Sequence, residues 1–314
     1  MDSNLVLFSG TSHPALADAV AKELGIEVTP MDIKRFACGE VYTRAIPSVR
    51  GKDVYIVQTG THNVNEDLME LFVMIDAVKR SFAKNVRVIV PHFPYARQDR
   101  VAYPREPITA KLVAKLIEEA GADHVISFGL HSAQIQGFFD KPMDNLSANK
   151  LFIDYFLSKK IDNLVVVSPD AGGAKEAKKF ADALGAGLAI LNKTRAEHNE
   201  SEVTHVVGDV EGKTCIIFDD MIDTAGSVCN AKKALEGSGV TGDIYLAATH
   251  AVFSDPATGR LTEAGFAEIV VSDTIPLDDK KMAIPGLTVL SIAPFIAKII
   301  ESVHLDKSVT DVIS

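Results

Sequence analysis

The chain has 314 residues, of which 47% are hydrophobic and 24% charged, a composition typical of globular proteins and sufficient for about two domains. The 32 basic and 42 acidic residues give a net charge of −10, which argues against nucleic acid as the main partner, because binding to a phosphate backbone needs a basic face. No apolar run is long enough to span a membrane. The N-terminal segment is expected to form a strand and not a signal peptide, and three cysteines without metal-ligand spacing suggest reduced thiols in the cytoplasm.

Short apolar runs rich in β-branched residues alternate with amphipathic stretches along the whole chain. Most of the runs lack strict polar–apolar alternation, so we expect strands that are buried on both faces of a parallel sheet. The expected strands are 5–10, 53–60, 86–92, 124–131, 164–170, 187–195, 215–220, 243–250 and 268–274, and helices are expected at 65–81, 107–122 and 226–239. This alternation predicts an α/β fold of two domains, with the turn-rich segment 138–150 as the boundary.

Polar residues gather where the expected strands end, which is where ligands bind to sheets of this kind. The stretch 215–228, "CIIFDDMIDTAGSV", is the clearest case. Its small and hydroxyl residues, Thr224, Ala225, Gly226 and Ser227, open the next helix, where free N–H groups bind anions. Asp219, Asp220 and Asp223 would repel a bare phosphate, but they can contact sugar hydroxyls or Mg²⁺. The stretch therefore predicts a sugar-phosphate site; the alternative is a strand followed by an Asp-capped helix.

Further candidate binding residues could each also have an ordinary structural role. In 168–175, "SPDAGGAK", paired glycines let backbone amides approach a diphosphate, although such pairs also serve ordinary turns. The segment 94–100, "PYARQDR", offers guanidinium groups suited to polyphosphate, or a solvated loop. The cations of 192–195, "NKTR", could equally form a solvated face, and His131 after a strand could be structural.

Several separated motifs together carry a resemblance that covers nearly the whole chain. They are "FACGE" (36–40), "PYARQDR" (94–100), "LHSAQIQGFFD" (130–140), "SPDAGGAK" (168–175), "NKTR" (192–195) and "GKTCIIFDDMIDTAGS" (212–227). The last motif resembles the ribose-phosphate loop of the type I phosphoribosyltransferase superfamily, and the set resembles the ribose-phosphate pyrophosphokinase (PRPP synthetase) family. The resemblance implies two similar phosphoribosyltransferase-like domains, 1–146 and 147–295, each a mostly parallel sheet flanked by helices, with the tail 296–314 packing back onto the first.

The resemblance also implies roles for individual residues in diphosphoryl transfer from ATP to ribose 5-phosphate. The implied catalytic residues are Lys193 and Arg195, and the implied Mg²⁺ ligands are His131 and Asp170. The implied ATP-binding residues are Phe36, Cys38, Glu40, Arg97, Gln98, Arg100 and His131, with Phe36 and Glu40 acting from a neighbouring subunit. Ribose 5-phosphate would be bound by Asp170, Asp219, Asp220, Asp223, Thr224, Ala225, Gly226 and Ser227, and the pyrophosphate loop would be Asp170, Ala171, Gly172 and Gly173. Phosphate is the implied activator, and a hexamer built from dimers the implied assembly. Ser48, Arg50, Ser81 and Ser308 fall where an allosteric ADP site would lie.

Two positions depart from the family pattern. Gly129 stands where Asp is usual before the histidine, and Cys38 stands where Asp or Asn is usual beside the adenine. A catalytically silent regulatory homologue is therefore an alternative to an active enzyme. A phosphoribosyltransferase that consumes PRPP would share the loop at 219–227, but it would not explain "PYARQDR" or the doubled architecture.

Overall fold

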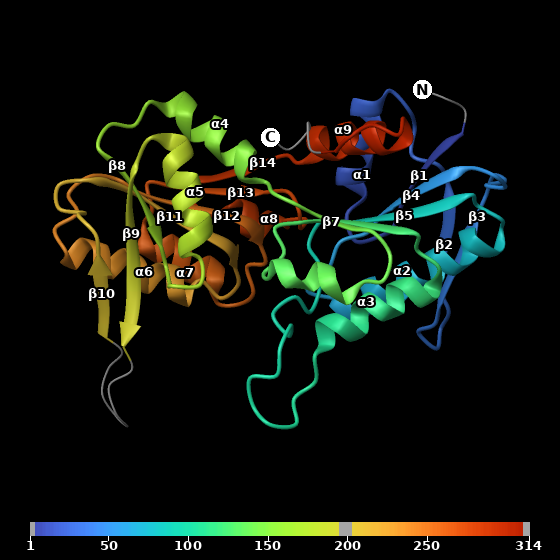
Figure 1. The fold of residues 1–314 in the computed structure, drawn as a ribbon, viewed down its shortest axis with the longest axis horizontal. Helices are drawn as coiled ribbons and strands as arrows, with labels where there is room; N and C mark the ends of the chain where they lie inside the picture. Colours follow the sequence, from blue (N-terminus) through green and yellow to red (C-terminus); the bar gives the residue numbers. More distant parts are fainter. Residues whose placement is uncertain (1–3, 195–202, 310–314) are drawn as a thin grey trace. The chain divides into compact units, whose positions relative to one another are not determined.

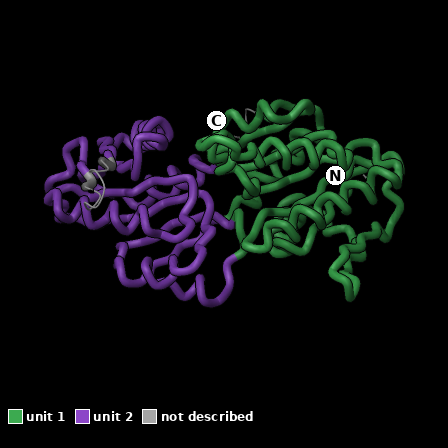
Figure 2. The backbone as a smooth tube through the Cα atoms, turned by 90° about the horizontal axis from the view of Figure 1, so that it is seen from below, with its two compact units in different colours: residues 1–147, 274–276, 291–314 green, residues 148–273, 277–290 purple. Residues whose placement is uncertain are grey.

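The computed structural model describes residues 4–194 and 203–309, which fall into two compact units (Figure 2). Unit 1 comprises Met1–Ser147, Thr274–Pro276 and Ser291–Ser314, and unit 2 comprises Ala148–Asp273 and Leu277–Leu290. The chain therefore leaves unit 1 after Ser147 and again after Pro276, and it returns at Ser291.

A parallel sheet forms the centre of unit 1, and its order among the described strands is β1-β4-β5-β6-β7 (Figure 1). The strands are β1 (Leu5–Ser9), β4 (Asp53–Val57), β5 (Asn85–Val90), β6 (His124–Phe128) and β7 (Met143–Leu146). Most of their residues are buried, as expected for strands covered on both faces. An antiparallel hairpin, β2 (Met31–Arg35) and β3 (Val41–Ala45), stands apart from this sheet.

Helices cover both faces of the sheet in unit 1. Side chains such as Val54 and Ile56 pack in one core with α2 (Val64–Arg80) and α3 (Thr109–Ala120). On the other face α1 (Pro14–Leu24) and α9 (Ala293–His304) contact each other (Figure 1). Tyr55 is fully buried, and its hydroxyl donates a hydrogen bond to the Ile300 carbonyl at 3.5 Å. The 3₁₀ helix Ala133–Phe138 follows β6.

Unit 2 is built on a larger sheet, with the order β10-β9-β8-β11-β12-β13-β14 in the part of the chain that is described. Its strands are β8 (Leu164–Ser168), β9 (Gly187–Thr194), β10 (Val203–Val207), β11 (Thr214–Ile222), β12 (Ile244–Ala251), β13 (Glu268–Ser272) and β14 (Leu287–Leu290). Neighbours pair in parallel except β10, which runs antiparallel to β9.

Alternate residues of β11 build the two cores of unit 2. Ile216 and Phe218 pack with α4 (Asn149–Lys159) and α5 (Ala174–Leu184), where the rings of Phe180 and Phe218 stack 4.3 Å apart. Cys215 and Ile217 face α6 (Gly226–Gly237) and α7 (Ala257–Ala264) on the opposite side. A short helix, α8 (Asp279–Met282), precedes β14. The expected architecture of two helix-flanked, mostly parallel sheets is confirmed.

The structure differs from the sequence-based prediction in several local features. Residues 143–146, expected to be part of a turn-rich segment, form β7, and β2, β3, β10 and β14 were not predicted. The strand expected at 215–220 extends two residues further, to Ile222.

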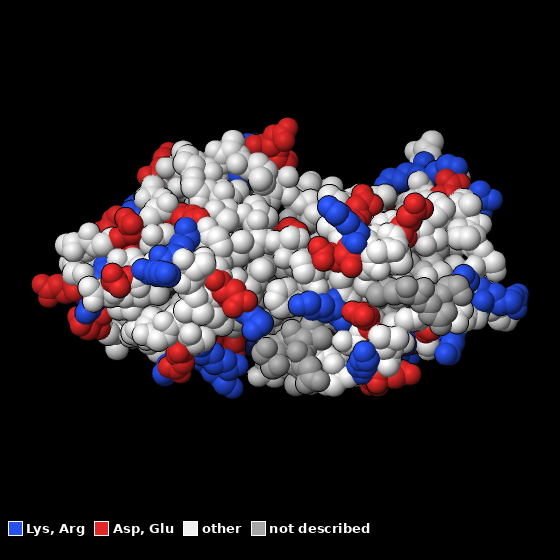
Figure 3. Space-filling model, turned by 90° about the horizontal axis from the view of Figure 1, so that it is seen from above, with Lys and Arg blue, Asp and Glu red and all other residues white. Residues whose placement is uncertain are grey.

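Two surface properties bear on possible partners. No helix within the described residues is long and apolar enough to cross a bilayer. Acidic and basic side chains are interspersed on the face seen in Figure 3, unlike the single-sign surface that binds nucleic-acid backbones.

Candidate active site

The carboxyl half of β11 presents carboxylates at an open edge. Pairing between β11 and β8 ends at Ile217 and Val167, whereas pairing between β11 and β12 continues to Ile222. Asp219 and Asp220 therefore lie beyond the last residue of β11 that β8 covers. Because strand side chains alternate, the two carboxylates start toward opposite faces.

Asp219 is the most strongly perturbed acid in this region. Burial raises the pKa of Asp219 to about 8, and the charges of Asp220 and Asp170 contribute in the same direction. The effect of Asp170 shows that the turn after β8 and the end of β11 share one electrostatic environment. Carboxylates with this mutual repulsion are stabilised by a cation or by donors such as sugar hydroxyls.

The loop between β11 and α6 is shaped by a left-handed residue. Ala225 precedes the helix with φ of 60° and ψ of 5°, a conformation that costs energy for a residue with a Cβ, and it is buried. Helix α6 begins at Gly226, and the first N–H groups of a helix have no partner within it. These groups and the helix dipole suit a phosphate. Ser227 is exposed in the same turn, and Asp223 lies just before it.

Arg260 of α7 supports this loop and was missed by the sequence analysis. Its Nη1 donates to the Thr224 carbonyl at 2.9 Å. A Cβ added at Gly226 would lie 3.3 Å from the same nitrogen, so the guanidinium is packed close to the start of α6. A single arginine in an amphipathic helix far along the chain gives no sequence signal of this contact.

The turn after β8 is closed by its own polar atoms. Oδ1 of Asp170 accepts a hydrogen bond from the Gly173 N–H at 2.9 Å, and the buried Ser168 hydroxyl donates to the Asp170 carbonyl at 2.7 Å. A Cβ on Gly172 or Gly173 would lie 3.1 Å or 3.0 Å from these oxygens, which is tighter than ordinary contact. The turn therefore favours glycine at both positions, and Ala171 and Asp170 remain exposed.

Lys193, one of the two candidate catalytic cations, falls at the end of a strand pair. Lys193 is the second-last residue of β9, and its backbone is in register with Thr204 of β10. Arg195 lies outside the described residues. Lys193 therefore lies within the strand that was expected at 187–195.

In unit 1 the candidate adenine-binding residues occupy the tip of the hairpin β2–β3. Phe36, Cys38 and Glu40 are all exposed, and the Phe36 ring is 53% exposed. The Phe36 N–H donates to the Glu40 carbonyl at 2.9 Å, and Gly39 has a φ of 96°, which favours glycine.

The candidate polyphosphate-binding residues lie in the loop between β5 and α3. Arg97, Gln98 and Arg100 are exposed. The Gln98 side chain accepts a hydrogen bond from the Thr109 hydroxyl at 2.6 Å, which joins this loop to the first residue of α3. His92, which the sequence analysis left without a role, has its Nδ1 2.8 Å from the Gly60 carbonyl oxygen.

His131 follows β6 by way of a left-handed glycine. Gly129 has a φ of 52°, and its N–H donates to the Leu146 carbonyl at 2.8 Å. The next N–H, of Leu130, donates to the Asn145 side chain at 3.0 Å. His131 itself is exposed.

The structure thus divides the candidate residues between the two units. Asp170–Gly173 and residues 219–227 lie around the carboxyl ends of β8 and β11 in unit 2, whereas Phe36, Arg97 and His131 belong to unit 1. Within the described ranges, no cluster of three or more His, Cys, Asp or Glu residues is arranged to hold a metal by itself. Mg²⁺ commonly takes one or two carboxylates and completes its shell with substrate phosphates and water, so the exposed Asp170 carboxylate fits that chemistry.

Comparison with known proteins gives a consistent result. Residues 5–121 match the model of the N-terminal domain of ribose phosphate pyrophosphokinase, and residues 196–313 match the phosphoribosyl synthetase-associated domain. A ribose-phosphate pyrophosphokinase of Synechocystis sp. is 47% identical over 310 residues, which is 98% of this chain and 92% of that protein. The chain belongs to the ribose-phosphate pyrophosphokinase family.

Further relatives extend this family assignment to other lineages and to a solved structure. The chloroplastic ribose-phosphate pyrophosphokinase 2 of Oryza sativa is 49% identical, over 99% of this chain and 78% of that protein. The crystal structure of phosphoribosylpyrophosphate synthetase from Mycobacterium smegmatis superposes with a TM-score of 0.92 at 48% identity, covering 97% of this chain and all of that one. Family membership identifies the chain as an enzyme of this type, with its two phosphoribosyltransferase-like domains.

Proposed function

We propose that the protein transfers the β,γ-diphosphoryl group of ATP to the C1 hydroxyl of ribose 5-phosphate and forms PRPP and AMP. The anomeric oxygen attacks the β-phosphorus in line, the bond from that phosphorus to the α-phosphate bridging oxygen breaks, and the hydroxyl proton is released. The observation that carries the proposal is the pairing of two loops around β8 and β11: an acid-rich strand end beside a helix N-terminus, and a diglycine turn beside it.

Different residues of unit 2 bind different parts of the substrates. The N–H groups at the start of α6, with Thr224, Ala225, Gly226 and Ser227, receive the 5-phosphate. Asp219, Asp220 and Asp223 accept hydrogen bonds from the ribose hydroxyls, which offsets the burial and the neighbouring charges that raise the pKa of Asp219. The turn of Asp170, Ala171, Gly172 and Gly173 offers backbone amides to the diphosphate.

The remaining candidate residues act on ATP and on the charge of the transferred group. Phe36, Cys38 and Glu40 recognise adenine from a neighbouring subunit, while Arg97, Gln98 and Arg100 bind the phosphates. Lys193 and Arg195 neutralise the charge that develops during transfer. Mg²⁺, with His131 and Asp170 as protein ligands, supplies charge neutralisation on the phosphates when bound.

The proposal also covers the activator, assembly, domain roles and cellular compartment of the enzyme. Phosphate is proposed as an activator and a hexamer built from dimers as the assembly. The domain roles follow the same scheme, with residues 1–146 binding ATP and residues 147–295 binding ribose 5-phosphate. Three free cysteines suit the reducing cytoplasm.

Two departures from the family pattern support a second candidate, a catalytically silent regulatory homologue. Gly129 removes a carboxylate two residues before His131, and Cys38 replaces a strong hydrogen-bonding side chain with a thiol, a weak donor and acceptor. The carboxylates of unit 2 are intact, which favours the active enzyme.

One assay separates the candidates. Purified protein is incubated with ATP, Mg²⁺, phosphate and ribose 5-phosphate, and AMP and PRPP are quantified together. Equal amounts of the two products are expected. Absence of both at saturating Mg²⁺ supports the silent homologue, whereas consumption of added PRPP in the presence of a free nucleobase supports a phosphoribosyltransferase.

A further inference from the structure

Helix α2 connects two segments of unit 1 that are far apart in sequence. The first is the hairpin β2–β3, which projects from the sheet with an exposed tip at residues 36–40. Thr43 of the hairpin donates a hydrogen bond from its hydroxyl to the Val73 carbonyl of α2 at 3.2 Å. The middle of the hairpin is therefore fixed to the helix, while residues 36–40 at its tip are exposed.

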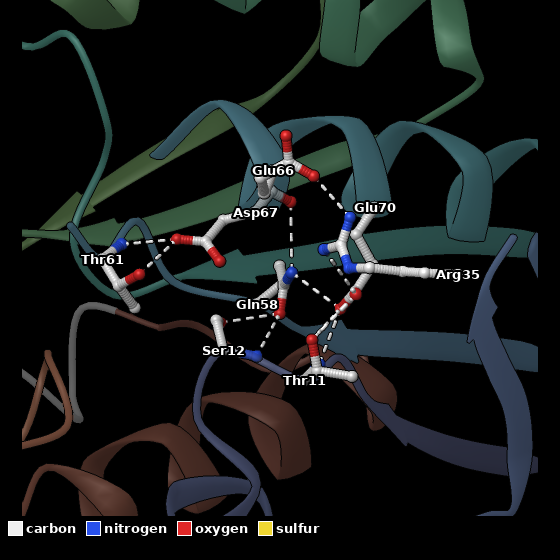
Figure 4. A network of polar contacts seen from close by, with 8 residues as sticks. All are labelled: Thr11, Ser12, Arg35, Gln58, Thr61, Glu66, Asp67 and Glu70. Carbon is white, nitrogen blue, oxygen red and sulfur yellow. Dashed lines mark hydrogen bonds and ion pairs between the residues drawn. The ribbon is translucent and has the colours of Figure 1, made fainter. Parts of the chain in front are cut away.

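Arg35, the residue before Phe36, makes the second attachment of the hairpin to α2. Its Nη1 donates to the Glu66 carboxylate in the first turn of the helix. Its Nη2 lies 3.8 Å from the Glu70 carboxylate one turn further on. The guanidinium thus spans two successive acids on one face of α2 (Figure 4).

Glu70 is an unusual anchor because its side chain is only 1% exposed. Burial of a carboxylate is costly unless donors surround it. The Thr11 N–H and hydroxyl donate to Glu70 at 2.6 Å and 2.8 Å, and the Gln58 amide donates at 3.0 Å (Figure 4). Gln58 in turn accepts from Ser12 at 2.7 Å. These contacts hold Glu70 against the ends of β1 and β4 and make it a rigid reference point.

The second segment is the loop after β5 that carries Arg97 and Gln98. The Tyr95 hydroxyl donates to the side chain of Asn65, which stands next to Glu66 in the first turn of α2. Tyr95 has a positive φ of 60°, and its carbonyl accepts from the Gln98 N–H at 2.9 Å. The first turn of α2 therefore contacts the hairpin through one residue and the loop through its neighbour.

We infer that the first two turns of α2 position both ATP-binding segments of the chain, with Arg35 and Tyr95 as positioning residues for the nucleotide. The inference rests on the proposed function only in taking Phe36, Glu40, Arg97 and Gln98 as ATP contacts. Arg35 sets where the exposed Phe36 ring stands, and Tyr95 sets the turn that presents Gln98. Since neither side chain is among the residues proposed to bind the transferred phosphates, their loss should affect nucleotide affinity and leave the transfer step intact.

The test compares Arg35→Ala with Lys34→Ala in the full-length protein. Lys34 pairs with Asp32 at 2.8 Å within the hairpin and does not reach α2, so it is a matched control. Arg35→Ala should raise KM for ATP by about two- to tenfold, the loss of about one hydrogen bond, with kcat within about twofold. KM for ribose 5-phosphate should stay unchanged. Arg35→Lys should recover part of the loss, and Tyr95→Phe should raise KM for ATP in the same direction.

Calorimetric titration of ATP into each variant keeps the test independent of turnover. If the wild type binds ATP but makes no PRPP, the proposed function fails, but the inference can still be tested by comparing the Kd for ATP of each variant with that of the wild type. Arg35→Ala combined with Glu66→Ala should bind ATP no worse than Arg35→Ala alone, because both remove the same link. The inference is overturned if Arg35→Ala leaves both KM and Kd for ATP unchanged, if it lowers kcat and thermal stability without a selective effect on ATP, or if Lys34→Ala has the same effect.

Discussion

Asp219 links the site to the pH dependence of stability. Its pKa rises from 3.8 to about 8 on folding, so between these values the folded protein retains a proton that the unfolded chain has lost. The free energy of unfolding therefore falls as pH rises through this window. Asp219→Asn should raise Tm, and the gain over the wild type should grow from about pH 5 to about pH 8. Thermal scans at several pH values test this; a gain that is the same at every pH would contradict it.

A substitution at Gly129 can test whether the proposed metal site lacks a carboxylate. Its φ of 52° is left-handed, and Asp and Asn are the residues with a Cβ that tolerate this region best, at a cost of about 1–2 kcal/mol. Gly129→Asp should move the Mg²⁺ activation curve to lower concentration, because a carboxylate adds an oxygen ligand.

Gly129→Asn is the matched control for this substitution, since it has the same shape and backbone cost but no charge. It should lower Tm equally and leave the Mg²⁺ curve in place. If the Asp and Asn variants have the same Mg²⁺ activation curve, position 129 does not contribute to metal binding. If only Gly129→Asp makes PRPP, the silent homologue is the correct interpretation of the wild type.

At the scale of elements, α7 supports the ribose-phosphate loop through Arg260. Arg260→Ala removes the hydrogen bond to the Thr224 carbonyl and loosens the start of α6. KM for ribose 5-phosphate should rise by about two- to tenfold with KM for ATP unchanged. Thr262→Ala on the same helix removes only a hydrogen bond to Thr258 and should change neither constant. Steady-state kinetics on both variants decide the point, and equal KM values would show that the loop needs no such support.

The proposed catalytic cations are Lys193, in β9, and Arg195, outside the described residues. Lys193→Ala and Arg195→Ala should each lower kcat by about 10²–10³, or about 3–4 kcal/mol, because they remove charge stabilisation of the transition state. Smaller changes are expected in ribose 5-phosphate affinity. Single-turnover rates with saturating substrates provide the measurement. Unchanged kcat in both variants would exclude this segment from catalysis.

Sequence patterns predicted the strands at the sheet centres and the buried edge strand β1, but they missed the other edge strands and the hairpin β2–β3. Buried parallel strands such as β8 and β11 appear as continuous apolar runs, since helices cover both their faces. The hairpin β2–β3 mixes charged and apolar residues because much of it faces solvent, and the half-buried β14 is short and lies at an edge. Strands of that kind lack the signal that marks the others.

The same contrast holds for the candidate site. Strand-end acids and diglycine turns are local in sequence and could be identified there. The contact of Arg260 with Thr224, and that of Arg35 with Glu66, join residues more than 30 positions apart. Such contacts depend on how helices pack onto the sheet, which no short motif encodes.

Regulation belongs to the scale of the whole molecule. Two of the segments proposed for allosteric ADP binding lie together: the Gly51 N–H donates to the Phe82 carbonyl at 2.8 Å, next to Arg50 and Ser81. The Arg50 guanidinium stands 4.3 Å from the Phe82 ring centre, so it would have to leave a cation–π contact to bind phosphate. The resemblance places an aromatic residue at position 313, where this chain has Ile, outside the described residues.

We therefore expect phosphate activation to persist and allosteric inhibition by ADP to be weak. Initial rates at rising ADP, measured at both limiting and saturating ATP, test this expectation. Saturating ATP should overcome most of the inhibition. Strong inhibition that ATP does not relieve would indicate a functional allosteric ADP site.

The return of α9 to unit 1 has a consequence for how the protein is made. Helices α1 and α9 pack together, and Tyr55 bonds to Ile300, so unit 1 lacks part of its covering layer until the last helix has left the ribosome. Unit 2 ends at Leu290 and can be complete earlier. Domains usually mature in order from the N-terminus during synthesis. Here unit 1 is begun first but completed last, and the apolar face that α9 covers stays exposed while unit 2 is translated.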